Sequence, residues 1–317
     1  MISFKNVIDN DLIKEQLSSS VEGGMIYHAY IIEGEKGIGK LNLALDFASY
    51  LVGDEKRVMS GNHPDVILVT NDKPESIGVE EIRTQVNDTA DIRPYMAEKK
   101  IYIINEAEKL TPQAQNALLK TLEEPPSFVV IMLLCTDEKK LLSTISSRCV
   151  KLKMKPATDA GIAEFVKKKF DIDEDELQVI VAFAAGNPGK AMRIAGSEDF
   201  RKLYEETMAL CSNIKNMGAH EIQAAVKRIR KLPVSQDDFF DLLQLRYRDL
   251  MMYKVTKDLN SITFRGERAA IMDSAALSSY EGIEKIMEAV EKCRIRIRAN
   301  VNPELALELM LLTMREN

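Results

Sequence analysis

The sequence predicts an N-terminal α/β domain with a parallel sheet and a phosphate-binding loop, followed by two all-α regions. Over the first half of the 317 residues, short apolar runs alternate with amphipathic stretches, as in a parallel sheet covered by helices. A glycine-rich turn, residues 34–40, joins the first apolar run to a helical pattern. After Lys155-Pro156, apolar runs of strand quality no longer occur, which predicts a purely helical remainder.

Five strands are predicted from apolar runs with turn signals at their ends. They cover residues 28–33, 65–70, 100–104, 128–135 and 149–154. Between them, residues 40–51 and 79–90 have helical spacing of their apolar side chains. Thr111-Pro112 predicts the start of a further helix, because threonine caps well and proline suits the first turn. This helix must stop before Pro125-Pro126.

The second half is predicted to hold a small helical module and a larger helical region. Thr158 is expected to cap a helix to about residue 170, and a second helix covers residues 173–185. A third, short helix follows Gly189, and Asn302-Pro303 starts the last helix of the chain. We place the domain boundaries at residues 1–155, 156–203 and 204–317.

The net charge, the cysteine spacing and the length of the apolar runs limit the classes of protein that fit this sequence. The net charge of −6 does not indicate a strongly basic nucleic-acid-binding protein. The four cysteines are scattered without a C-x-x-C pair, so we expect neither zinc nor a disulfide framework. No apolar run reaches the roughly 20 residues of a membrane span, and no signal sequence opens the chain. We therefore expect a cytoplasmic protein without membrane contact.

The glycine-rich turn matches a nucleotide-binding motif except at the magnesium position. The template G-x-x-x-x-G-K-[ST] needs a hydroxyl after the lysine, because that oxygen binds Mg²⁺ while loop and lysine hold the phosphates. Here the sequence reads Gly34-Glu-Lys-Gly37-Ile-Gly39-Lys40-Leu41, so a leucine replaces the metal ligand. Binding of ATP or ADP and retention of the loop for packing alone remain alternatives.

A second metal position has changed as well. The strand at residues 100–104 runs into Asn105-Glu106, where a P-loop ATPase has Asp-Glu. Asparagine brings no charge to neutralise Mg²⁺, and without a well-held metal phosphoryl transfer loses its main electrostatic stabiliser. Glu106 alone could still orient a water molecule. We therefore predict no metal site, no required cofactor and loss of intrinsic ATP hydrolysis.

Basic residues offer two further candidate sites. Arg148, in Ser147-Arg148-Cys149, is either an arginine finger for a neighbouring subunit's nucleotide or a surface arginine paired with a local carboxylate. The clusters at residues 227–231 and 292–298 are either solvated helix faces or contacts for phosphates or an acidic partner.

Taken together, the motifs resemble those of AAA+ clamp-loader subunits over nearly the whole chain. The most specific is Leu118-Leu-Lys-Thr-Leu-Glu-Glu-Pro-Pro126. The other matching segments are His63-Pro-Asp65, residues 106–110, Cys135-Thr-Asp137, Ser147-Arg148-Cys149 and residues 300–308.

The resemblance implies roles for several residues. It implies a P-loop AAA+ domain, a helical lid and a helical collar that oligomerises. Thr136 falls at the sensor-1 position, and Gly189 stands where sensor 2 would supply an arginine to the γ-phosphate. The family's cysteine zinc module is not carried over, because residues 52–59 contain no cysteine. Arg148 matches the family's finger, so the resemblance favours its action in trans.

The resemblance also implies a role in DNA replication. The expected partners are delta and gamma/tau-like subunits of the bacterial DNA polymerase III clamp loader and, through that complex, the sliding clamp and primer–template DNA. The chain would be a non-hydrolysing member, and no carboxylate constellation for nucleotide polymerisation is evident. The rival hypotheses are an active AAA+ ATPase, such as a motor subunit, and a nucleotide-independent DNA-binding protein.

Overall fold

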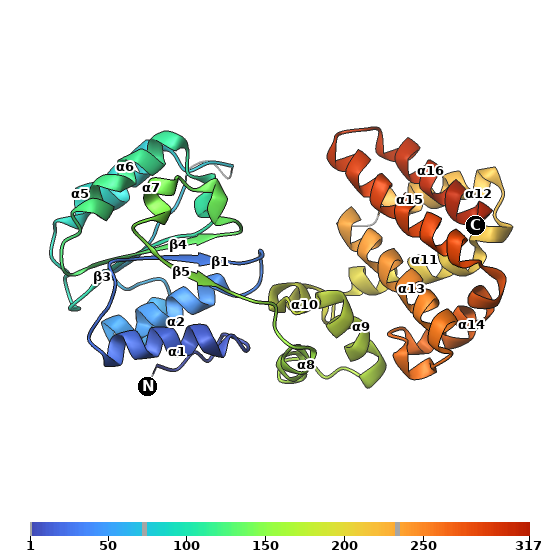
Figure 1. The fold of residues 1–317 in the computed structure, drawn as a ribbon, viewed down its shortest axis with the longest axis horizontal. Helices are drawn as coiled ribbons and strands as arrows, with labels where there is room; N and C mark the ends of the chain where they lie inside the picture. Colours follow the sequence, from blue (N-terminus) through green and yellow to red (C-terminus); the bar gives the residue numbers. More distant parts are fainter. Residues whose placement is uncertain (1, 72–74, 232–234) are drawn as a thin grey trace. The chain divides into compact units, whose positions relative to one another are not determined.

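A computed structural model describes residues 2–71, 75–231 and 235–317 (Figure 1). The chain divides into two compact units. The first runs to Ile162 and includes Gly186–Gly189, and the second comprises Ala163–Ala185 and Lys190–Asn317. The predicted division into three domains, with boundaries after residues 155 and 203, is not tested by this division into two units and remains a prediction.

The first unit is built on a five-stranded parallel sheet in the order β2-β3-β4-β1-β5. The strands are β1 (Ala29–Glu33), β2 (Val66–Leu68), β3 (Lys100–Ile104), β4 (Val129–Cys135) and β5 (Val150–Lys153). All five predicted strands are thus confirmed, with ends shifted by at most two residues. The central strand β1 pairs Ile32 with Leu134 of β4 and with Leu152 of β5.

Each face of the sheet is covered by helices, because alternate strand residues point to opposite sides. On one face, Ile32, Ile103 and Met132 pack with α1 (Asp11–Glu22) and α2 (Lys40–Val52). On the other face, Ile31, Tyr102 and Ile131 pack with the α4–α5 segment, α6 and α7. Figure 1 shows these two helix layers on either side of the strands. Helix α1 was not predicted.

The remaining elements of the first unit connect the strands. They are α3 (Glu55–Met59), α4 (Val79–Ile82), a π turn (Arg83–Asn87), α5 (Asp88–Ala90), η2 (Ala107–Lys109), α6 (Pro112–Glu123), η3 (Glu138–Lys140) and α7 (Ser143–Ser146). The predicted cap of α6 is confirmed, because the Thr111 side chain accepts a hydrogen bond from the backbone N–H of Ala114. The predicted helix at residues 79–90 is confirmed as the α4–α5 segment, with the π turn in its middle.

Asp65 holds the segment before β3 in place. Its carboxylate, which is 2% exposed, accepts hydrogen bonds from the backbone N–H groups of Tyr95, Met96 and Ala97 at 2.6, 2.7 and 3.0 Å. Burial raises the pKa of this carboxyl, but the three amide bonds together lower it below the ordinary value of 3.8.

Asp65→Asn is expected to destabilise the first unit by about 2–3 kcal/mol, because one carboxamide nitrogen would face backbone donors. The native pKa is depressed, so the Asp65 contribution is present above the unfolded pKa and disappears as pH falls through the native pKa. In urea unfolding between pH 7 and 3, the free energy of unfolding should therefore fall less steeply towards acid in Asp65→Asn than in the wild type. Asp91→Asn, at an exposed position of the same segment, is the control. Equal stability of the two variants would contradict the assignment.

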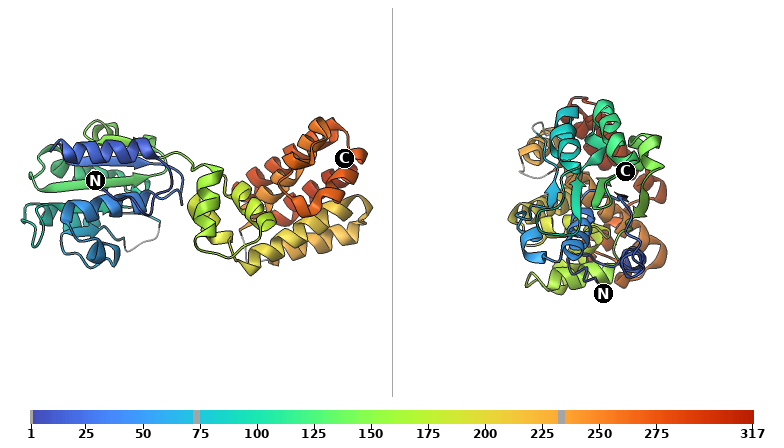
Figure 2. Two further views of the ribbon diagram at one scale, coloured as in Figure 1. Left: turned by 90° about the horizontal axis from the view of Figure 1, so that it is seen from below. Right: turned by 90° about the vertical axis from the view of Figure 1, so that its left-hand side faces the viewer.

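The described part of the second unit contains helices only, as the views in Figure 2 show. They are α8 (Asp159–Lys167), which begins at the end of the first unit, α9 (Glu174–Ala184), α10 (Pro188–Ile194), α11 (Glu198–Asn213), η4 (Ile214–Asn216), α12 (Ala219–Lys231), α13 (Gln236–Thr256), η5 (Leu259–Ser261), η6 (Arg265–Glu267), α14 (Arg268–Leu277), α15 (Tyr280–Arg298) and α16 (Pro303–Glu316). Thr158 caps α8 through the N–H of Gly161, and Asn302 caps α16, as predicted.

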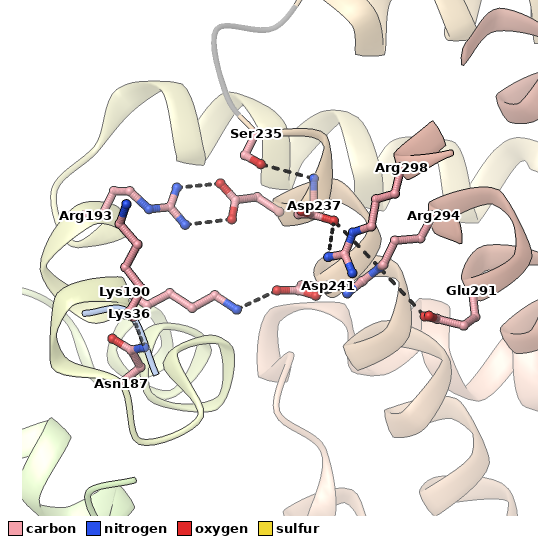
Figure 3. A network of polar contacts seen from close by, with 11 residues as sticks. Lys36, Asn187, Lys190, Arg193, Ser235, Asp237, Asp241, Glu291, Arg294 and Arg298 are labelled. Atoms are coloured by element: carbon pink, nitrogen blue, oxygen red, sulfur yellow. Dashed lines mark hydrogen bonds and ion pairs between the residues drawn. The ribbon is translucent and has the colours of Figure 1, made fainter. Parts of the chain in front are cut away.

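A network of ion pairs joins α10 to α13 and α15 within the second unit (Figure 3). Arg193 makes a two-pronged pair with Asp238 at 2.5 and 2.7 Å, and the Asp238 side chain is 3% exposed. Asp241 pairs with Lys190 at 2.5 Å and with Arg294 at 2.7 Å. These ion pairs thereby connect α10, which begins at Pro188, to the long helices α13 and α15 of the C-terminal region.

Candidate nucleotide site

The predicted site residues of the first unit gather at one edge of the sheet. Parallel strands present their carboxyl ends together, and ligands of such sheets bind there. The glycine loop leaves β1, Asn105-Glu106 follows β3, and Thr136 follows β4. The order β3-β4-β1 places these three ends side by side. The structure therefore brings these three predicted segments together, and their role in nucleotide binding stays a prediction.

The loop itself has the backbone of an anion cradle. Gly37 and Gly39 have φ angles of 88° and 108°, in the left-handed region that glycine tolerates. A Cβ at Gly34 would lie 3.0 Å from the Ile38 Cγ2 and 3.2 Å from the Met154 Cβ, so the loop is tightly packed. Helix α2 starts at Lys40, and its first N–H groups form the positive end of a helix dipole.

Lys40 is turned toward its own loop. Its Nζ donates hydrogen bonds to the carbonyl oxygens of Gly34 and Glu35 at 2.6 and 2.9 Å, and the residue is 8% exposed. Burial lowers the pKa of this ammonium, and the nearby Glu108 carboxylate opposes the shift. Phosphate binding by Lys40 would have to replace both carbonyl contacts.

The residues at the two metal positions do not fit Mg²⁺. Leu41 is partly buried and packs against the core beneath α2, so its side chain is apolar and committed to packing. Asn105 is exposed, in the turn after β3. In P-loop NTPases, Mg²⁺ is held by the Ser/Thr hydroxyl of the loop and by an aspartate carboxylate, in addition to phosphate oxygens. We therefore derive no catalytic step through a metal–nucleotide complex in this chain.

Glu106 is held by two lysines. Its Oε1 accepts from Lys36 Nζ at 2.9 Å and its Oε2 from Lys109 Nζ at 2.5 Å. The bonds from Lys109 and Lys36 lower the pKa of this carboxyl. Its backbone is left-handed, with φ 52°. A carboxylate with both oxygens ion-paired and a lowered pKa is a poor general base for activating water.

The sensor-1 position is engaged by a residue that sequence reasoning missed. Thr136 donates its hydroxyl to the Glu108 Oε1 at 2.7 Å, and its N–H donates to the same oxygen at 3.3 Å. The other carboxylate oxygen, Oε2, is buried and finds no hydrogen-bond partner among the described residues. A carboxylate beside Thr136 disfavours a γ-phosphate there by charge repulsion. Only its position two residues after Glu106 could have drawn attention to Glu108.

The segment Gly186–Gly189 closes against the loop within the first unit. The N–H of Gly189 donates to the Gly37 carbonyl at 2.9 Å, and Asn187 Nδ2 donates to the Lys36 carbonyl at 2.8 Å. A Cβ at Gly189 would lie 2.8 Å from the Gly37 Cα, so this position has no room for an arginine. Gly189 thus has a packing role at the position where sensor 2 would hold a phosphate.

The contacts described for Arg148 do not include any residue of the glycine loop. It follows α7, and its guanidinium pairs with Glu123 Oε1 at 2.8 Å and donates to the Thr144 carbonyl at 2.9 Å. The side chain is 36% exposed. In the isolated chain Arg148 therefore pairs with a local carboxylate. This pairing is one of the two interpretations that the sequence offered for Arg148. Glu123 was not singled out from the sequence.

The two basic clusters are largely ion-paired. In the first, Arg228 pairs with Glu206 at 3.3 Å, and Arg230 pairs with Glu304. In the second, Lys292 pairs with Glu288 at 2.7 Å, and Arg294 and Arg298 pair with aspartates of α13. These ion pairs favour the interpretation of the two clusters as charged, solvated helix faces. They disfavour the alternative, in which the clusters bind phosphates.

No helix within residues 2–71, 75–231 and 235–317 combines the length and the apolar character needed to cross a membrane.

The parallel sheet, the glycine loop between β1 and α2 and the helical C-terminal part define a P-loop protein of the AAA+ class. Residues 9–158 match the family described as "DNA polymerase III, delta subunit". The chain is similar to subunits of the AAA+ clamp-loader family.

Three known proteins illustrate this similarity. DNA polymerase III subunit delta′ of Bacillus subtilis is 27% identical, over 96% of this chain and 95% of that protein. DNA polymerase III subunit gamma of Buchnera aphidicola is 25% identical, over 98% and 94%. A gamma subunit-related protein of Thermotoga maritima shares the fold, with a TM-score of 0.50, 20% identity and coverage of 96% and 98%.

Proposed function

We propose that this chain is a delta-prime-like stator of the DNA polymerase III clamp loader, a subunit that does not itself hydrolyse ATP. It would assemble with delta and gamma/tau-like subunits and help to load the sliding clamp onto primer–template DNA. Similarity over almost the full length to delta-prime and gamma proteins supports the assembly partners.

The observation that carries the stator role is the degraded metal position next to an intact loop. Leu41 is packed into the core, Asn105 is neutral, and Thr136 is engaged by Glu108. Leu41 lies in the first turn of α2, Asn105 follows β3 and Thr136 follows β4, and all three features would weaken the binding of Mg²⁺ and a γ-phosphate. Energy for the complex would then come from neighbouring subunits, to which Arg148 would contribute its guanidinium in trans.

Phosphate release by the purified chain tests the loss of hydrolysis. We expect no Mg²⁺-dependent turnover of ATP above the protein-free rate, because Leu41 replaces the hydroxyl ligand of the metal and Asn105 replaces the carboxylate. Lys40→Ala serves as the matched control, since it removes the phosphate-binding lysine without touching the metal positions. Turnover near the roughly 1 s⁻¹ of an ordinary slow enzyme, abolished in Lys40→Ala, would favour the active ATPase instead.

A further inference from the structure

Arg246 of α13 is a buried charge without a counterion. The residue is 2% exposed, and its Nε and Nη1 atoms find no hydrogen-bond partner in the part of the chain that the structure describes. Among the described residues it also forms no ion pair. An arginine cannot escape this situation by losing its proton, because guanidinium stays charged in proteins. A buried, unpaired charge is strongly unfavourable, so the side chain requires an anion.

Tyr204, Cys211 and Tyr247, on which the charge of Arg246 acts, do not supply that anion. Burial raises the pKa of Tyr204 to about 12 and that of Cys211 to about 11, so both are neutral near pH 7. Burial also raises the pKa of Tyr247 well above its ordinary value. The charge of Glu267 also raises the pKa of Tyr204 and of Cys211. This carboxylate makes no ion pair with Arg246.

Arg246 lines a cavity of about 360 Å³ formed by α11, α13, α14 and the C-terminal helices. This volume falls in the range of small-molecule sites. Its wall carries hydrogen-bond donors, among them Lys215, Asn216 and Ser278. The Lys215 Nζ donates hydrogen bonds to the Ser278 Oγ and to the main-chain oxygen of Asn317, both at 3.3 Å, which places this second cation beside a hydroxyl of the same wall.

The rest of the wall selects the kind of anion. Leu250, Leu277 and Met314 are apolar, so the cavity suits a molecule with an apolar body. Asp273 is the acidic residue of the wall, and with the two cations it leaves one net positive charge. That balance favours a monoanion over a dianionic phosphate. The planar guanidinium matches a carboxylate with two parallel hydrogen bonds.

We propose that this cavity binds a small organic carboxylate, with the carboxylate on Arg246 and the apolar part against Leu250, Leu277 and Met314. The site is independent of the glycine loop and of the proposed stator role. Because the anion neutralises a charge that is buried in the folded state, its binding stabilises the second unit.

Benzoate is the probe, with benzamide as its neutral match and inorganic phosphate at equal ionic strength. Calorimetric titration of the full chain should show saturable binding of benzoate and none of benzamide. In Arg246→Met, which keeps an unbranched but shorter side chain without the charge, benzoate should bind roughly 10- to 100-fold more weakly. The benzoate-induced rise in melting temperature should disappear in the same variant.

Arg228→Met is the matched control, because it removes an exposed arginine that pairs with Glu206 outside the cavity. It should bind benzoate as the wild type does. The proposal is overturned if benzoate does not bind the wild type, if benzamide binds equally well, or if phosphate binds and benzoate does not. Should Arg246→Met fail to fold, the benzoate–benzamide comparison on the wild type decides alone.

Discussion

Replacing Arg148 by alanine is expected to abolish most of the ATP hydrolysis at the adjoining site of the assembled clamp loader. Arginine fingers contribute about 10³- to 10⁵-fold to the rate of phosphoryl transfer, because they neutralise charge that develops on the transferred phosphate. The isolated chain should be unaffected, since Arg148 is 36% exposed and makes a surface ion pair. The measurement is DNA-stimulated ATP turnover of the reconstituted complex, with single-turnover rates to isolate the affected site.

Glu123→Ala supplies the matched control for this experiment. It removes the carboxylate that pairs with Arg148 at 2.8 Å but leaves the guanidinium in place. If Arg148 acts in trans, Glu123→Ala should retain hydrolysis, because the arginine is only released from its local partner. If the ion pair itself matters for folding or assembly, both variants should lose activity alike. Equal losses, or full activity of Arg148→Ala, would remove the finger role.

Arg193→Ala is expected to loosen α10 from α13 and to cost about 3 kcal/mol. The substitution leaves the Asp238 carboxylate, 3% exposed, without the cation that binds both of its oxygens. Removal of one partner from such a pair is costly because the other charge stays buried, about 3–5 kcal/mol for a fully buried pair. We expect the lower end of that range, because the Arg193 side chain is 50% exposed.

Hydrogen exchange of the full chain measures this effect locally. Amides of α10 and of the start of α13 should exchange faster in Arg193→Ala, while those of the sheet stay protected. Arg201→Ala is the control, because its pair with Glu176 at 3.5 Å is more exposed and should contribute at most about 1 kcal/mol. An exchange pattern in Arg193→Ala no different from that of Arg201→Ala would show that the pair does not hold these helices together.

Local patterns predicted the glycine loop and the caps of several helices correctly, because these features depend on neighbouring residues. Thr111 and Thr158 cap the helices that their positions indicated. By contrast, helix α1 was missed, and α10 begins at Pro188, before the predicted point. The 186–189 segment illustrates the difference, since Gly189 was singled out from the sequence but its contact with the glycine loop was not predicted.

By itself, the sequence determined the parallel α/β sheet and the helical remainder, and it gave rise to the prediction of a nucleotide-type site with two altered metal positions. These follow from the alternation of apolar residues and from motifs within about ten residues of each other. Only the tertiary structure decided that Glu108 engages Thr136, that Gly189 packs on Gly37 and that Arg246 is buried without a partner. Such contacts join residues far apart in the chain, and their energies depend on burial and charge around each group, which local sequence does not specify.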